Sequence, residues 1–91
     1  MIELITISKT GEQWHLNKII VNPQHIALVV ECLEHQRLLR EGKIDLALDN
    51  HIRFSTVRMA SISGFDDFIA VGSPNTIMEK MNKNTKQLLK G

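Results

Sequence analysis

The proline at position 23 is the feature that most constrains the fold of this chain, because two long apolar runs meet there. Proline has no backbone N–H to donate, and it disfavours the helical conformation for the residue before it, here Asn22. Neither a continuous helix nor a central strand is therefore expected to cross this point. The chain should change direction, with one strand ending at Val21 and the next beginning at Ile26.

Alternation of apolar and polar residues on both sides of this break predicts β-strands. A first strand over residues 2–7, a turn at Gly11 and a second strand from Trp14 to Val21 make a hairpin. The third strand, over residues 26–32, has apolar side chains on both faces, as is typical of strands that are covered on both sides. We therefore expect it to be central in the sheet or covered on both faces.

Residues 33–40 allow two interpretations. They could form two helical turns ended by Gly42, or the outer part of a long hairpin that turns at this glycine. We favour the hairpin, because three apolar residues that follow alternate with polar ones. These residues are Ile44, Leu46 and Leu48. The apolar alternation then changes phase after Phe54, which predicts a bulge or a break near Ser55.

The last third of the chain predicts a turn, a strand and a helix. The segments Ser61–Gly64 and Asp66–Asp67 predict the turn, and residues 68–71 form the last strand. A helix should start at Ser73, a good N-cap, with Pro74 at its first position. Its apolar stripe consists of Ile77, Met78, Met81, Leu88 and Leu89. Weak helix formers near its end predict fraying of the final turns unless a partner subunit packs on them.

Together these elements predict an α+β fold. We expect a single domain over residues 1–91, with a mostly antiparallel β-meander sheet of five or six strands and a C-terminal α-helix.

Charge balance and residue usage exclude several classes of function. With 11 Lys and Arg against 10 Asp and Glu, the chain has no global field to attract nucleic acid or an anionic membrane. Cys32 is the only cysteine, which excludes an internal disulfide and fits a reduced, cytoplasmic setting. No apolar run approaches a membrane span, and the four histidines lack ligand spacing. We therefore expect no membrane contact, no metal and no cofactor.

Several residues occur in an order that is found elsewhere. They are Met1, Ile2, Leu4, Gly11, Leu16, Asn17, Val21–Ile26, Thr56–Met59 and Ile69–Ser73. This order resembles that of a family of small bacterial and bacteriophage proteins typified by the flagellar protein FlbD. Residues 33–54 look like an insertion into the family pattern, and Gly72 stands where the pattern has an acid. The resemblance implies a β-meander fold and a non-enzymatic protein that regulates through contacts.

Catalytic chemistry is not expected. Cys32 with a histidine could supply a nucleophile and its base, but this cysteine is in phase with the apolar residues of its strand. That phase predicts an inert core residue. Asp66 and Asp67 would point to opposite faces of a strand, so they cannot act as an acid–base couple. The sequence also lacks a glycine-rich phosphate loop, and we predict that the protein is not an enzyme.

Two groups of basic residues are candidate anion sites. The better candidate consists of Arg37, Arg40, Lys43, Arg53, Arg58 and Ser73. A helix N-terminus offers free backbone donors to a phosphate, and arginine can bind phosphate through two parallel hydrogen bonds, so a nucleotide or oligonucleotide would suit this set. The second candidate is a row of lysines on the final helix, Lys80, Lys83, Lys86 and Lys90. The alternative for both is that the charges only solvate exposed faces.

These observations predict a non-enzymatic binding module of bacterial or phage origin that acts as a homo-oligomer. The apolar residues of segment 33–54 outnumber what a lone hairpin can bury, so contact with a second copy is expected. The ligand would be a host protein or an anionic small molecule such as a nucleotide. One alternative is a phage anti-defence protein that sequesters a cyclic nucleotide signal. Another is a nucleic-acid-binding or flagellar regulator, although the scarcity of aromatic residues counts against nucleic acid.

Overall fold

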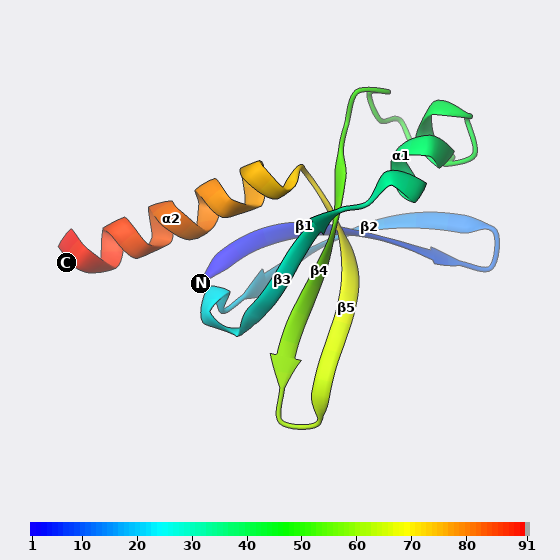
Figure 1. Ribbon diagram of the computed structural model, residues 1–91. Helices are drawn as coiled ribbons and strands as arrows, with labels where there is room; N and C mark the ends of the chain where they lie inside the picture. The colour runs from blue at the N-terminus through cyan, green and yellow to red at the C-terminus, as the bar shows by residue number, and fades with distance from the viewer. Residues whose placement is uncertain (91) are drawn as a thin grey trace.

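The computed structural model describes residues 1–90, with side chains through residue 83. The elements in chain order are β1 (Ile2–Thr10), β2 (Gln13–Val21), the short 3-10 helix η1 (Pro23–His25), β3 (Ile26–Glu31), α1 (Leu33–Arg40), β4 (Phe54–Ser61), β5 (Gly64–Val71) and α2 (Pro74–Lys90). The described strands form one five-stranded antiparallel sheet in the order β2-β1-β5-β4-β3 (Figure 1). The predicted α+β class, with a β-meander-like sheet and a C-terminal helix, is confirmed.

The sheet combines a hairpin with a three-stranded meander. β1 and β2 form the predicted hairpin, and Gly11 adopts a φ of 62° in its turn. β3, β4 and β5 follow one another as neighbours, and β1 joins them by pairing Thr6 with Ala70 and Ile7 with Ile69. β2 and β3 are therefore the two edges of the sheet.

The predicted change of direction at Pro23 is confirmed. The side-chain oxygen of Asn22 caps η1 by accepting a hydrogen bond from the Gln24 N–H at 3.0 Å. Pro23 follows this cap at the start of η1, where a helix needs no N–H donor.

The prediction that β3 is central or covered on both faces is wrong. β3 is an edge strand, and only its Ile26 and Val29 side chains pack against the first core cluster described below. On its other face Leu28 and Val30 are 46% and 43% exposed.

The hairpin predicted for residues 33–54 is also wrong. Residues 33–40 form α1 instead, and residues 43–53 contain no strand. α1 forms because Gln36 and Leu39 fall one turn apart and are both buried against the sheet. Gly42 then adopts a φ of 74°, which ends the helix in the way the alternative interpretation expected.

The apolar alternation after α1 has a different origin from a strand. The Leu46 N–H bonds to the Ile44 carbonyl at 2.9 Å, and the Leu48 N–H bonds to the Leu46 carbonyl at 2.8 Å. Such γ-turns span three residues and produce the same alternation as a strand. Ile44 is buried and the two leucines are half-buried against the sheet of their own chain. These apolar residues, for which contact with a second copy was expected, thus pack within their own chain.

The strand β4 has no irregularity near Ser55, where one was predicted. β4 pairs with β5 without interruption from Phe54 to Ser61, so the prediction is wrong. The register shifts in β3 instead, where Ala27 is an extra residue between Ile26 and Leu28. The change of apolar phase in β4 reflects a sheet that is covered on both faces.

Asp66 and Asp67 are strand residues, so their prediction as turn residues is wrong. They lie in β5 opposite Met59 and Arg58, respectively. The turn is confined to Ser61–Gly64, and Asp67 forms an ion pair with Arg58 directly opposite it in the hairpin.

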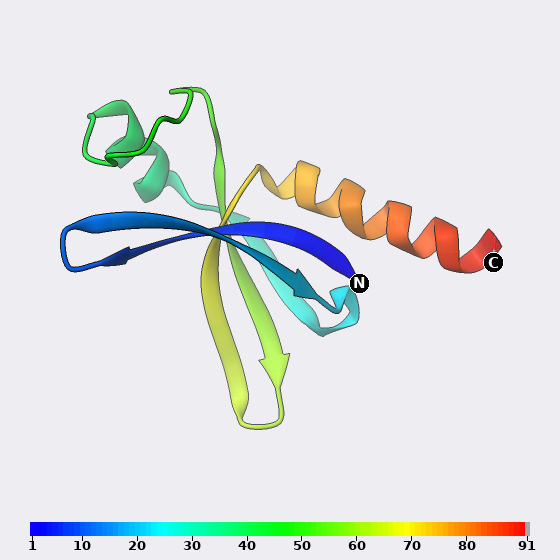
Figure 2. The same cartoon turned by 180° about the vertical axis from the view of Figure 1, so that it is seen from behind.

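The core is divided between the two faces of the sheet. The first cluster consists of Ile2, Leu4, Val57, Ala70 and Ile77, and it lies under α2. The second cluster consists of Ile7, Leu39, Ile44 and Phe54, and it lies under α1 and residues 43–53. Successive strand residues point to opposite faces, which separates Leu4 from Ile7 and Val57 from Phe54. Accordingly, α1 and α2 lie on opposite sides of the strands in both views (Figures 1 and 2).

α2 begins as predicted. Ser73 Oγ accepts a hydrogen bond from the Thr76 N–H at 3.2 Å, and Pro74 is the first residue of the helix. Ile77 is buried, whereas Met78 is 55% exposed, so the apolar stripe is only partly covered. The predicted stripe residues Leu88 and Leu89, and the predicted fraying, lie outside the side chains that the structure describes. Within the described part of the chain, neither helix has the length and apolar composition that crossing a bilayer requires.

Candidate functional site

The six residues predicted to bind an anion are spread over the molecule. Arg37 and Arg40 are exposed on α1, Lys43 follows α1, Arg53 precedes β4, Arg58 lies within β4, and Ser73 precedes α2. Four of the five cations are paired with carboxylates: Arg37 and Lys43 with Glu41, Arg53 with Glu31, and Arg58 with Asp67. An anion would have to compete with these carboxylates, which weakens the case for a shared phosphate site.

The pair between Arg58 and Asp67 is the best defined of these contacts. Its two hydrogen bonds are 2.8 Å and 3.1 Å long, and they lower the pKa of the Asp67 carboxyl. The Arg58 guanidinium also lies 5.9 Å from the centre of the exposed Phe65 ring. The contacts of the Arg58 side chain are therefore made within the β4–β5 hairpin. In the same way, the hydrogen bond from Lys43 lowers the pKa of Glu41.

Two of the six predicted residues, Arg53 and Ser73, line one hollow of about 320 Å³. A hydrogen bond of 2.7 Å from the Gly72 N–H to the Arg53 carbonyl holds the two segments together. The Arg53 guanidinium is 2.9 Å from a Glu31 carboxylate oxygen, and the Ser73 hydroxyl caps α2 at Thr76. The two predicted residues that line this hollow thus already have hydrogen-bond or ion-pair partners for their polar groups.

Cys32 and His35 form the one cysteine–histidine contact of the described residues. Cys32 Sγ lies 3.2 Å from His35 Nδ1, and the His35 ring packs on Trp14 and Phe54, with ring centres 5.7 Å and 5.9 Å away. Burial lowers the pKa of His35, against a smaller opposing effect of Glu34. Cys32 is half-buried and packs against the second cluster, directly after the end of β3. The pair belongs to the packing of that cluster.

Neither the predicted lysine row nor a set of metal ligands forms a further candidate site among the described residues. Lys80 Nζ donates a hydrogen bond to the Glu3 carbonyl at 3.1 Å, Lys83 is exposed, and Lys86 and Lys90 lie outside the described side chains. Among the described residues, no three His, Cys, Asp or Glu side chains gather as metal ligands do.

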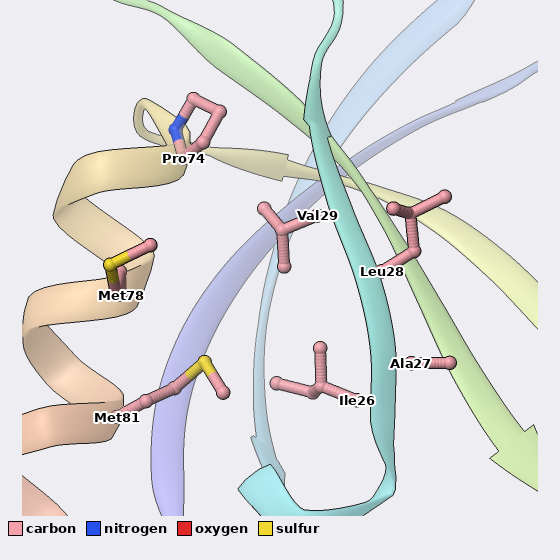
Figure 3. A pocket seen from close by; sticks show the side chains of 7 residues that line it. All are labelled: Ile26, Ala27, Leu28, Val29, Pro74, Met78 and Met81. Carbon is pink, nitrogen blue, oxygen red and sulfur yellow. The ribbon is translucent and has the colours of Figure 1, made fainter.

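An apolar groove of about 230 Å³ lies between β3 and α2 (Figure 3). The residues that line it are Ile26, Ala27, Leu28, Val29, Pro74, Met78 and Met81. Ile26 and Val29 point from β3 toward α2, and Met81 points back toward them. This described lining contains no charged side chain, so the groove is suited to an apolar occupant.

The groove lies beside the unpaired edge of β3. In the part of the chain that the structure describes, β3 pairs with β4 alone. The Cys32 N–H bonds to the Phe54 carbonyl at 2.8 Å, and inward and outward groups alternate along an antiparallel strand. The backbone groups of Val29 and Glu31 must therefore point away from β4. They form an open row of donors and acceptors.

Sequence reasoning missed this site because it placed β3 inside the sheet. The signal that could have found it is the run Ile26–Val30, which is apolar on both faces and has no charge. A strand with such a sequence needs cover on both faces, and the single chain supplies it on one.

Comparison of the chain with protein-family models, with curated proteins and with solved structures gave no match.

Proposed function

We propose that this protein is a small, non-enzymatic binding module that recognises another protein chain by adding it as a strand to the edge of β3. The observation that carries this proposal is the open edge of β3 beside the apolar groove on α2. In strand addition, main-chain hydrogen bonds supply affinity, and pockets for alternate side chains supply specificity. A cytoplasmic setting is part of the same proposal.

The difference between the two sheet edges supports β3 as the recognition edge. Natural proteins protect free edges with charged residues, lysine above all, or with proline. β2 carries Lys18 at its middle, and this lysine lies 3.6 Å from Glu3 of β1. The run Ile26–Val30 of β3 carries no such residue. The bulge at Ala27 protects only the start of β3, and the regular part after it stays open.

Binding of a strand peptide tests this proposal. The isotope-labelled protein, at a concentration where it is monomeric, is titrated with a short peptide of alternating Val and Thr. We expect NMR shift changes at the amides of Val29 and Glu31 and at the methyl groups of Met78 and Met81. The same peptide with a central proline should bind at least tenfold more weakly, because one of its donors is lost.

Two matched variants give the test its control. Val30→Lys should weaken peptide binding, whereas Ile20→Lys, the same change at an exposed residue of the β2 edge, should leave it unchanged. Absence of binding, or shift changes along β2 in place of β3, would refute strand recognition at this edge.

A second candidate function is the binding of an anionic small molecule, such as a cyclic nucleotide, in the hollow between Arg53 and Ser73. The observation in its favour is that the fold brings these two residues together with His51 and Thr76. Calorimetric titration with cyclic nucleotides, compared with the Arg53→Ala variant, tests it. Equal heats for the two proteins would remove this candidate.

A further inference from the structure

We infer that the chain fitting the β3 edge is β3 of a second copy, paired antiparallel about a two-fold axis at Val29. The inference rests on the proposed function, since it names the occupant of the same edge. In this arrangement the two five-stranded sheets of the copies join into one continuous sheet. It also provides the homo-oligomer that the sequence suggested, through β3 in place of residues 33–54.

The hydrogen-bond phase of β3 allows this register. Outward-facing residues of two antiparallel edges pair by exchanging both backbone hydrogen bonds. Val29 faces outward, so it can pair in this way with the partner's Val29. A centre at Val29 also uses residues 27–31 of both copies, all within β3, and of these only Ala27 lies at the bulge. A centre one residue later would draw in Cys32, where the chain leaves the sheet for α1.

The side chains of β3 are complementary to themselves in this register. Leu28 lies opposite the partner's Val30, and the partner's Leu28 lies opposite Val30. Both residues are large, apolar and roughly half-exposed on the same face of the single chain. Cross-strand pairs of this kind are the unit of sheet stabilisation. The pairing therefore covers the face of β3 that its own chain leaves open.

Charge also favours a second copy as the occupant. Identical strands repel each other if like charges meet, but the run Ile26–Val30 has no charged residue. The one charge of β3, Glu31, falls opposite the partner's Ala27 and is already paired with Arg53 at 2.9 Å. No like charges therefore lie opposite each other where the two β3 strands pair.

The contact area requires α2 as well as the strands. A six-residue strand is about 20 Å long, so strand pairing alone covers on the order of 500 Å² per copy. Standard specific interfaces cover about 800 Å² per partner. The two-fold axis places both α2 helices on the same face, where the 55% exposed Met78 extends the contact. We therefore expect a dimer in which the strand seam and the helices both contribute.

Charge-swapped variants test the dimer and its register. Analytical ultracentrifugation should show a dimer for the natural chain and a monomer for Leu28→Lys/Val30→Lys, with self-association weakened at least tenfold. Leu28→Glu/Val30→Glu should likewise be monomeric, because both variants place like charges opposite each other. Mixing the two variants should restore association as a heterodimer, since a lysine then lies opposite a glutamate wherever position 28 of one copy faces position 30 of the other.

A cross-link gives an independent measure of the register. Leu28 and the partner's Val30 would form a non-hydrogen-bonded pair, whose Cα separation of about 4.5 Å allows a disulfide. Oxidation of Leu28→Cys/Cys32→Ser mixed with Val30→Cys/Cys32→Ser should therefore give the mixed disulfide far faster than Val30→Cys/Cys32→Ser alone. Ile20→Lys on β2 is the control that should leave the dimer intact, and circular dichroism checks that each variant is folded.

Two other outcomes would overturn the inference. A chain that stays monomeric at millimolar concentration yet binds strand peptides at β3 refutes self-pairing and leaves the proposed function standing. A dimer that survives the lysine variant is held by another surface. If the lysine variant does not fold, Glu31→Pro compared with Glu31→Ala decides the matter. Both changes remove the ion pair to Arg53, but only proline removes the outward N–H, so equal dimer affinities would refute the pairing.

Discussion

The two faces of the sheet are covered by segments of different kinds. α2 covers the first cluster and begins at a cap formed by neighbours in the sequence, Ser73 and Thr76. The cover of the second cluster is α1 followed by the irregular residues 43–53, which a bond from Trp14 Nε1 to the Lys43 carbonyl fixes at 3.1 Å. The first cover is thus specified locally, whereas the second depends on contacts between distant parts of the chain.

The largest expected effect comes from emptying each cluster in turn. Phe54 and Leu4 are both fully buried, the first under the irregular cover and the second under α2. Phe54→Ala should lower the free energy of unfolding by about 3–5 kcal/mol and Leu4→Ala by about 2–5 kcal/mol, measured by urea denaturation. A loss below about 1 kcal/mol for Phe54→Ala would mean that the second cover is too loose to leave a cavity.

What could be predicted from the sequence follows the same division. The break at Pro23, the first hairpin and the start of α2 were predicted correctly, because each depends on conformational preferences of adjacent residues. The interpretation of residues 33–54 failed, since γ-turns repeat with the period of a strand. Packing of Leu39 and Ile44 on the sheet, which decides between helix and hairpin, is a tertiary effect.

The candidate site was harder to predict than the fold. The prediction grouped Arg53 with Ser73, and the two residues line one hollow. Glu41 pairs with cations close to it in sequence, Arg37 and Lys43, but the carboxylates that pair with Arg53 and Arg58 come from neighbouring strands. The position of β3 at an edge depends on the order of strands, which alternation within one strand does not encode.

A smaller effect is expected from releasing the anchor of the second cover. Trp14→Phe keeps an aromatic ring but removes the hydrogen bond to the Lys43 carbonyl. The free energy of unfolding should fall by about 0.5–1.5 kcal/mol, and residues 43–53 should exchange amide hydrogens faster than the first turns of α2. Uniformly faster exchange over the whole chain would show that the second cover does not open by itself.

The smallest expected effect is a pH dependence of the free energy of unfolding, caused by His35 in the second cover. Burial lowers the pKa of His35 below 6.5, its value in the unfolded chain. As pH falls through this value, the unfolded state binds the proton first, so the free energy of unfolding should decrease. Urea denaturation between about pH 7.5 and pH 5.5 should show this decrease in the natural chain and a flatter profile for His35→Phe. An NMR titration of His35 at its ordinary pKa would contradict the assignment.

The extra residue at Ala27 has a consequence for how this chain tolerates change. Because the register shifts there, Ile26 and Val29 both point toward α2 although they lie three positions apart in the sequence, an odd spacing. Removing Ala27 would make the ladder regular, and Ile26 would stay opposite Met59, two positions before Val29 and on the same face. Loss of this one residue should therefore be accepted, because the first cluster keeps both side chains.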